Sequence, residues 1–457
     1  MIGVQCYPVS LLLEGADEAL AAMRRVLGAE AVLMCVNEVE CPEVFAAPLP
    51  HFSEGVYFTP NGEYCFEADP SCYERNGLVP ERTRDSRLRD FDAVRALVDA
   101  ARRTGLKSYA WIQTFHLAPE LARHPEAAMV DFRGCRLRDW ACPSNPTVVG
   151  YNLALIEDLL TRYELTGVFL DRFRFPSPYD GISAFFTCFC ERCRERASAL
   201  GIDYQRCLDD VRRIYDWMQS VGAEELETWR HAGYGSGMSL LETHARMPGL
   251  FTWLTFRQHL ISDYVGKAAS LLRGRGPKRE LGLDIWPPAY ALPVGQDWQG
   301  LAALADWVKP ILYPMRAGPA SLAGELVAIL RGWRQLNPTV PIDSVLEVLY
   351  RFFGFESVGA RTVEEIGAIG FPPPIYPLEM RRGRALAQNR VPIFAGCPIV
   401  DTGPEEVADR VEAAARTDAD GIFYYCYDYA TWENLEISGK VWREIRGRKS
   451  DSLQRGY

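Results

Sequence analysis

The stretch Gly167-Val-Phe-Leu-Asp171-Arg172-Phe-Arg174-Phe-Pro176 joins a short apolar run to a carboxylate and two arginines. Similar apolar runs recur along the chain, and helical patterns separate them. The expected strands are residues 3–8, 31–36, 107–113, 167–170, 281–286, 308–313, 392–397 and 421–425. Near-continuous apolar runs that alternate with helices are typical of a parallel sheet covered on both sides. No GxGxxG or phosphate-loop pattern follows any run, so an α/β fold of the (β/α)8 TIM-barrel type is predicted rather than an open doubly wound sheet.

Helix signals support this alternation. In 16–27, Leu20, Met23 and Leu27 fall on one face, and residues 92–104 are also expected to be helical. Ser144-Asn145-Pro146 is typical of a helix start, with a capping side chain followed by proline in the first turn.

Three long excursions interrupt the strand–helix rhythm, at about 38–89, 177–249 and 338–389. The first two follow strands two and four, so a barrel would carry them on its C-terminal face, where active sites are built. They contain enough apolar residues to pack as lobes over that face, or to form a homo-oligomer contact. The expected organisation is one catalytic barrel over 1–449 with these insertions, and a C-terminal tail over 450–457.

Composition restricts the class of protein. The formal net charge is −10, and the 50 Lys and Arg residues form no basic stripe, so neither nucleic acid nor an anionic membrane is an expected partner. The apolar run at 10–13 is too short for a signal peptide, and no run is long enough to span a membrane. Thirteen cysteines, an odd number with several in apolar strands, favour a reducing compartment. We therefore expect a soluble, cytoplasmic protein.

The sharpest candidate for chemistry is Asp171, which ends an apolar strand at the expected barrel mouth. Arginine beside a carboxylate favours its ionised, oriented form, as a nucleophile or base requires. The alternative is a structural Asp–Arg pair at the rim. Asp284, at the end of the neighbouring strand, is the proposed acid/base, and Trp286 would make its site less polar. A capping or loop-binding Asp is the alternative, and Asp401, Asp428, Glu433 and Glu38 are further candidates for the partner carboxylate.

Other side chains near strand ends are candidates for substrate binding, because aromatic faces stack on sugar rings and polar groups bind hydroxyls. The candidates are Arg172, Arg174, Trp111, Gln113, His116, Trp286, Tyr313, Asp401 and Asp428, with Phe115, Tyr427, Trp432 and Arg316 as weaker ones. Each aromatic residue alone could equally be core or rim packing. The histidines form no HxH or HExxH pattern, so a catalytic zinc or di-metal hydrolase is not expected. No serine nucleophile elbow stands on a strand-to-helix turn, and no organic cofactor is expected.

Cysteines form a second motif, Cys188-Phe-Cys190-Glu-Arg-Cys193, directly after the strand-four site. Three thiolates in six residues need a fourth ligand for a tetrahedral zinc site, and Cys142 in the preceding loop could supply it. Cys135 is the spare. Such a site has no open position for water, so the zinc would be structural. The alternative is four reduced, packed cysteines.

The CxCxxC motif and the preceding Cys-Pro-Ser-Asn-Pro loop resemble the structural zinc site of family 42 β-galactosidases, which implies Cys142, Cys188, Cys190 and Cys193 as ligands. That family has an Asn-Glu pair where this chain has Leu170-Asp171. Residues 167–176 and the Ala419-Asp420-Gly421 entry to the last strand instead resemble glycoside-hydrolase barrels related to the α-amylase and α-galactosidase clans. That resemblance implies Asp171 as nucleophile and, from the amylase clan, Asp284 as acid.

The sequence therefore predicts a glycoside hydrolase of retaining type acting on an oligosaccharide or glycoside. A carboxyl separation of about 5 Å would give retention and roughly 6.5–9.5 Å inversion. A carbohydrate-binding barrel without turnover is one alternative. A lyase or isomerase barrel is another, but it usually needs a metal or a strand-end lysine, and Lys107 and Lys309 are expected to begin strands.

Overall fold

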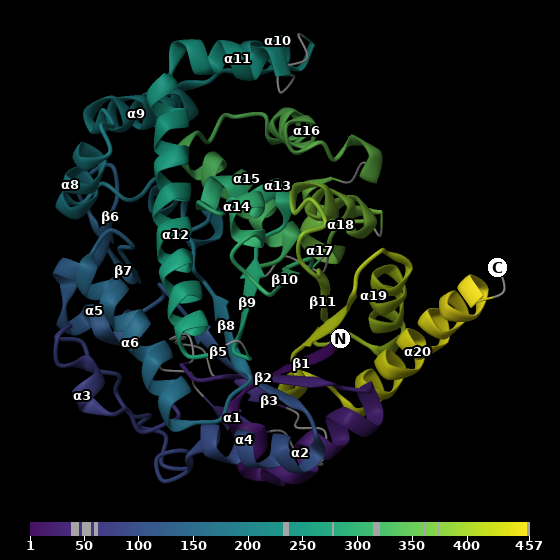
Figure 1. Ribbon diagram of the computed structural model, residues 1–457. Helices are drawn as coiled ribbons and strands as arrows, with labels where there is room; N and C mark the ends of the chain where they lie inside the picture. The colour runs from purple at the N-terminus through teal and green to yellow at the C-terminus, as the bar shows by residue number, and fades with distance from the viewer. Residues whose placement is uncertain are drawn as a thin grey trace.

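The computed structural model describes residues 1–37, 45–47, 56–58, 63–231, 237–276, 278–313, 320–359, 362–372 and 374–454. Eight parallel strands form its centre, in the order β10-β9-β8-β5-β2-β1-β12-β11 (Figure 1). Their bounds are β1 Ile2–Cys6, β2 Ala31–Cys35, β5 Lys107–Gln113, β8 Gly167–Asp171, β9 Glu280–Ile285, β10 Trp307–Pro310, β11 Phe394–Pro398 and β12 Gly421–Tyr425. A parallel bridge between Val308 and Ile393 joins the two ends of this order. The sheet is therefore a closed (β/α)8 barrel, and the predicted fold is confirmed.

Helices surround the barrel and build the excursions. Their bounds are α1 Pro8–Ser10, α2 Ala16–Ala22, α3 Pro70–Tyr73, α4 Ala93–Thr104, α5 Ala118–Arg123, α6 Pro146–Arg162, α7 Ile182–Phe185, α8 Glu191–Ala199, α9 Tyr204–Ser220, α10 Ala223–His231, α11 Gly237–Arg246, α12 Pro248–Gly274, α13 Pro288–Ala291, α14 Trp298–Ala302, α15 Leu322–Leu336, α16 Ile342–Phe353, α17 Val363–Ile369, α18 Ile375–Leu386, α19 Pro404–Arg416 and α20 Trp432–Gln454. Two short antiparallel pairs complete the fold, β3 Phe45–Ala47 with β4 Val56–Phe58 and β6 Ala128–Val130 with β7 Arg136–Ala141.

The predicted helix signals are found in place. The Asn145 side chain accepts a hydrogen bond from the Thr147 N–H at the start of α6, and Pro146 is the first helical residue. The helix expected over 16–27 is α2 followed by a π-helical segment, Met23–Leu27. No helix within the described ranges is long and apolar enough to cross a membrane.

Aromatic side chains fill the barrel interior. Phe169 stacks on Trp307 with ring centroids 5.3 Å apart, and Phe394 stacks on Phe423 at 5.0 Å. Gly282 faces the Trp307 ring so closely that a Cβ there would collide with it. The barrel is thus a packed core, and a substrate can reach only the side chains at its mouth.

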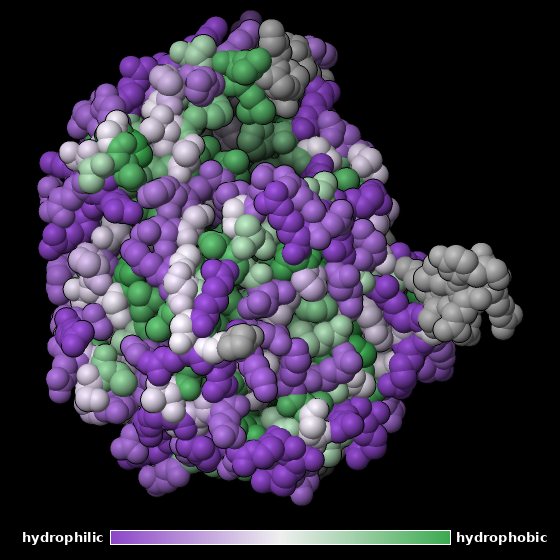
Figure 2. All heavy atoms as spheres, in the orientation of Figure 1, coloured by the Kyte–Doolittle hydropathy of each residue, from purple (hydrophilic) through white to green (hydrophobic). Residues whose placement is uncertain are grey.

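The second excursion packs against α15 and the residue that follows it, directly before the third excursion begins. The Trp333 indole of α15 donates to the carbonyl of Met218 in α9 at 2.9 Å, and the Asn337 amide donates to Val221 O, also at 2.9 Å. The second excursion begins where β8 ends, so it belongs to the C-terminal side of the barrel. In the space-filling view, hydrophobic side chains gather in a hollow between α11 and α16, and smaller hydrophobic patches lie among hydrophilic side chains over the rest of this face (Figure 2).

Candidate active site at the barrel mouth

Four polar side chains lie at one level across neighbouring strands. The register pairs Gln113 of β5 with Asp171 of β8, and Asp284 of β9 with Lys309 of β10. Leu170 pairs with Leu283, so Asp171 and Asp284 follow at adjacent positions. Side chains at paired positions of a parallel sheet point to the same face. The structure therefore brings the two predicted carboxylates together at the C-terminal end of the barrel.

Asp171 is held at both carboxylate oxygens. The Trp111 indole N–H donates to Oδ2 at 3.0 Å, and the backbone N–H of Arg172 donates to Oδ1 at 2.6 Å. The side chain is half-buried, so it remains accessible from solvent. Trp111 was predicted as a sugar-stacking residue, whereas its clearest role in the structure is to orient Asp171.

Asp284, at the same level, is buried and paired with Lys309. The Lys309 ammonium donates to Oδ1 and Oδ2 of Asp284, both at 3.0 Å, and to the Tyr313 hydroxyl at 2.9 Å. Burial raises the pKa of Asp284 to about 8, the charge of Asp171 adds to that rise, and Lys309 opposes it. A carboxyl group with this pKa can hold a proton at neutral pH, as a general acid must.

The prediction that Lys309 begins its strand is wrong. Lys309 is the third residue of β10 and is fully buried at the barrel mouth, whereas Lys107 does begin β5 and pairs with Glu280 at the other end. The expected strand over 308–313 misled the prediction, because β10 ends at Pro310. The alternation with the inward Trp307 could have placed Lys309 on the interior face.

Aromatic rings line the mouth around Asp171. Trp111 lies 5.4 Å from the Tyr7 ring and 6.2 Å from the Tyr425 ring, measured between centroids. Tyr425 stacks on Tyr313 at 5.6 Å, and Tyr7 meets Tyr429 edge-on at 5.6 Å. Only Trp111 and Tyr313 were predicted. Tyr7 and Tyr425 follow or end strands one and eight, which is the signal that could have found them.

Arg172, Arg174 and His116 lie together on one side of the mouth. Arg174 is buried between the Trp140 and Trp286 rings, with its guanidinium carbon 4.7 and 4.4 Å from their centroids. Burial lowers the pKa of His116 well below its ordinary value, and the charges of Arg172 and Arg174 lower it further. His116 is thus neutral, and Arg172, which is half-buried, is the more exposed of the two arginines.

Several predicted residues have other surroundings. Trp286 packs on the Arg174 guanidinium. The raised pKa of Asp284 is explained by its burial, not by the Trp286 ring. Gln113 is buried, and Asp401 is exposed beyond β11. Asp428 is fully buried and accepts the Tyr7 backbone N–H at 2.7 Å, which ties the ends of β1 and β12 together.

The weaker candidates also have defined places. Phe115 packs on Tyr264, the Tyr427 hydroxyl donates to Glu14, and the Trp432 indole donates to Glu436. Glu433 is exposed at the start of α20. Glu38 and Arg316 lie outside the described residues.

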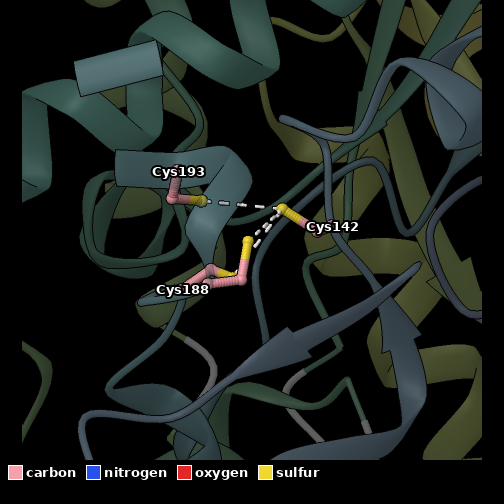
Figure 3. A group of neighbouring side chains, drawn as sticks. Cys142, Cys188 and Cys193 are labelled. Atoms are coloured by element: carbon pink, nitrogen blue, oxygen red, sulfur yellow. Dashed lines mark hydrogen bonds between the residues drawn. The ribbon is translucent and has the colours of Figure 1, made fainter. Parts of the chain in front are cut away.

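Four cysteines from separate segments converge in the structure. Cys142 follows β7, Cys188 and Cys190 lie between α7 and α8, and Cys193 is in α8. Their sulfurs lie within 4.8 Å of one another, and Figure 3 shows the labelled thiols pointing inward. The Cys142 sulfur is 3.5 Å from those of Cys190 and Cys193 and 3.7 Å from that of Cys188. A tetrahedron with zinc–sulfur bonds of ~2.3 Å has sulfurs about 3.8 Å apart, so the cluster matches zinc in size.

Electropositive groups lie around the cluster, whereas burial raises the pKa of the Cys142 and Cys193 thiols. Backbone N–H groups of Val130 and Ser144 donate to the sulfurs of Cys188 and Cys142, at 3.3 and 3.4 Å. Among the described residues, no hydrogen-bond partner is found for any nitrogen of the Arg257 guanidinium, which is buried nearby. It lies over the Phe175 and Trp253 rings. Burial lowers the pKa of Arg257 well below its ordinary value, and negative charge on Cys188 and Cys193 would oppose that shift. An unpaired buried cation is costly, and a negatively charged metal–thiolate group would compensate it.

Every cysteine in the described part of the chain is a free thiol. Because the fourth ligand comes from the loop before α6, a metal here would pin the segment after β8 to the rest of the barrel. The donor set therefore fits a structural zinc ion, with Cys135 exposed and outside the cluster.

The barrel fold of this chain is shared with known glycosidases. The chain is similar to α-L-fucosidase isoenzyme 2 from Paenibacillus thiaminolyticus, with a TM-score of 0.52 and 11% identity over 95% of this chain and 46% of that one. It is similar to a β-galactosidase from the psychrophilic Marinomonas ef1 (TM-score 0.54, 12% identity, 99% and 60% covered). It is also similar to the catalytic domain of a β-amylase from Paenibacillus polymyxa (TM-score 0.52, 10% identity, 98% of both chains).

At these identities the likeness shows the fold. The chain spans about half of the fucosidase and three fifths of the β-galactosidase, but nearly all of the β-amylase catalytic domain. No protein-family model matches the sequence, and no curated protein matches it either.

Proposed function

We propose that this protein is a glycoside hydrolase that acts on a carbohydrate substrate at the mouth of the barrel. The observation that carries the proposal is the placement of Asp171 and Asp284 at adjacent register positions, one half-exposed and one buried with a raised pKa. Glycoside hydrolysis needs one ionised and one protonated carboxyl group, and environments that separate two carboxyl pKa values assign these roles. The fold shared with glycosidases supports the same class.

In this proposal Asp171 is the nucleophile of a retaining reaction. The Trp111 N–H and the Arg172 N–H hold its oxygens at the barrel mouth, so the carboxylate is oriented before substrate arrives. Attack of one oxygen on the anomeric carbon would form a glycosyl ester as the glycosidic bond breaks, and water would then release the sugar.

Asp284 is the proposed acid/base. Its raised pKa suits proton donation to the leaving oxygen, and Lys309 fixes its orientation. Both of its oxygens contact Lys309, so proton transfer requires that one of these contacts be exchanged for the leaving group.

The Cys142, Cys188, Cys190 and Cys193 cluster is proposed to hold structural zinc. The metal would supply no chemistry to the reaction, because four protein thiolates leave no position for water or substrate.

The test is turnover of α- and β-linked aryl glycosides by wild type, Asp171→Asn and Asp209→Asn. Asp209 is an exposed carboxylate on α9, remote from the barrel mouth, and serves as the matched control. Turnover by wild type and Asp209→Asn, but not by Asp171→Asn, supports the proposal. A 2-fluoro glycoside should then label a peptide that contains Asp171. Equal rates in Asp171→Asn and wild type would overturn the nucleophile assignment.

A second test asks whether Asp284 is the acid that protonates the leaving group. Asp284→Asn should lose most of its rate on aryl glycosides with poor leaving groups and little on dinitrophenyl glycosides, which leave without protonation. An equal loss on both kinds of leaving group would mean that Asp284 is not the acid.

The two alternative classes, a carbohydrate-binding barrel and a lyase or isomerase barrel, can be tested with the same wild-type and variant proteins. Sugar binding in calorimetry without turnover would favour a carbohydrate-binding barrel. A lyase using Lys309 would be trapped by borohydride in the presence of its carbonyl substrate. The three acceptors around the Lys309 ammonium disfavour a nucleophilic amine, so we expect no trapping.

A further inference from the structure

Arg172 is held in an unusual position directly after Asp171. Its φ of +49° lies in the left-handed region, which residues other than glycine, asparagine and aspartate rarely adopt. Its backbone is fixed from both sides, since its N–H donates to Asp171 and its carbonyl accepts from the Phe115 N–H. Strained residues that the surroundings over-determine cluster at functional sites.

The Arg172 side chain differs from the other cations at the mouth in its partners. Lys309 is fully satisfied by Asp284 and Tyr313. Arg174 donates to the Phe175 carbonyl at 2.8 Å and pairs with Asp180 at 3.5 Å. Among the residues that the structure describes, no hydrogen bond or ion pair is formed by the Arg172 guanidinium, although it is half-buried.

The neighbours of Arg172 do not neutralise it. Its charge acts on His116 and Arg174, one neutral and one cationic. The carboxylate of Asp171 is the nearest acid along the chain, but its oxygens accept from Trp111 and from the Arg172 backbone rather than from the guanidinium. His116 adds a ring with a buried Nδ1 that has no hydrogen-bond partner in the described structure.

We infer that the substrate carries a carboxylate on the sugar that Asp171 attacks, as in a hexuronic acid, and that Arg172 binds this carboxylate with His116 beside it. The planar guanidinium matches a carboxylate in two parallel hydrogen bonds. Arg172 is adjacent to the proposed nucleophile in sequence, so its ligand lies on the reacting sugar or next to it. The claim that the bound sugar is a substrate rests on the proposed function, whereas binding of the sugar by Arg172 can be tested by itself.

The experiment uses two independent readouts. Calorimetry with Asp171→Asn measures binding of the methyl α- and β-glycosides of glucuronic and galacturonic acid, and of the matching glucosides and galactosides. The same measurement is made in the double variants that add Arg172→Gln or Arg172→Gly. Glycine adopts a positive φ without strain, so Arg172→Gly removes the guanidinium while the backbone keeps its conformation. Circular dichroism and thermal melting confirm that both variants fold.

We expect at least one uronide to bind about tenfold more tightly than its neutral counterpart, and both Arg172 substitutions to abolish that preference. High salt should weaken uronide binding and leave neutral binding unchanged. Turnover of nitrophenyl uronides and neutral nitrophenyl glycosides by wild type, Arg172→Gln and Arg172→Gly gives the second readout.

The outcomes separate the two claims. Uronide binding that depends on Arg172, without turnover of any glycoside, supports the inference and overturns the hydrolase proposal. Turnover of neutral glycosides with no uronide preference, unchanged in Arg172→Gln, supports the hydrolase and overturns the inference. Absence of uronide binding in folded Asp171→Asn also overturns the inference.

Discussion

The indole Nε1 of Trp111 lies 3.0 Å from Oδ2 of Asp171, so a residue two positions from the end of β5 fixes a carboxylate at the end of β8. The contact crosses the mouth between two neighbouring strands. It joins an aromatic wall, in which Trp111 contacts Tyr7 and Tyr425, to the group that is proposed to react. Orientation of Asp171 and packing of the mouth therefore depend on one side chain.

Replacement of Trp111 by Phe should separate these two roles. Phenylalanine keeps a ring in the wall but loses the N–H, and a hydrogen bond to a charged group contributes about 1.5–3 kcal/mol. We expect kcat/KM to fall by about 10- to 100-fold with a small change in melting temperature. Trp333→Phe is the control, because that indole donates to a backbone carbonyl far from the mouth. Unchanged kcat/KM in Trp111→Phe would contradict the orienting role.

The raised pKa of Asp284 predicts a pH dependence of stability. Its pKa in the folded protein is about 8, above the unfolded value of about 3.9, so the folded state binds the extra proton. The contribution of this group is fully present below pH ~4 and is lost as pH rises towards 8. The unfolding free energy should fall across this window, with a slope of at most ~1.4 kcal/mol per pH unit from one group.

Asp284→Asn should flatten this slope, because asparagine carries no proton to lose. Denaturant unfolding at intervals between pH 4 and 8 measures it, with Asp209→Asn, an exposed carboxylate, as the control. Parallel profiles for wild type and Asp284→Asn would show that Lys309 keeps Asp284 ionised in the folded protein at all these pH values.

The fold could be predicted because each strand is recognisable as a local apolar run in the sequence. Residues 107–113 and 421–425 are apolar runs, and their predicted bounds are those of β5 and β12. The side chains at strand ends were harder to assign, because burial and partners are set by tertiary packing. Asp428 has the same sequence context as a catalytic carboxylate, yet its oxygen accepts the Tyr7 backbone N–H at the other end of the chain.

Arg174 and Lys309 also show that local sequence does not determine which side chains reach the site. One was expected there and is enclosed elsewhere, and the other was not expected there and lies beside Asp284. Arg174 stands three residues after Asp171 and was expected at the substrate, but two tryptophans from distant segments enclose it. Lys309 was set aside because it stands early in an apolar run, but the strand ends one residue later and places it beside Asp284. Neither the partner nor the strand end is encoded in the local pattern.

The cysteine cluster predicts one zinc ion per chain. Elemental analysis of protein purified without chelator should find it, and Cys190→Ser should lose it and lower the melting temperature. Cys207→Ser is the matched control, since Cys207 is a buried thiol in α9 outside the cluster. Metal-free wild-type protein with unchanged stability after chelator treatment would favour four reduced, packed cysteines instead.

Arg257 provides a separate test of the charge on that cluster. Within the described part of the chain its guanidinium is buried without a hydrogen-bond acceptor, and negative charge on the nearby thiols would stabilise its protonated form against burial. If the cluster carries negative charge, Arg257→Met should remove the compensating cation and leave a buried anion unpaired. We therefore expect faster loss of zinc to a chromogenic chelator than in wild type, by about tenfold.

Arg331→Met is the control for Arg257→Met, because Arg331 is exposed on α15. Four neutral thiols make the opposite prediction: with no anion to compensate, methionine would relieve a buried, unpaired cation and raise the unfolding free energy. A charged metal–thiolate cluster predicts a lower unfolding free energy in Arg257→Met, because a buried anion is left unpaired. The sign of the change in unfolding free energy therefore distinguishes such a cluster from packed thiols.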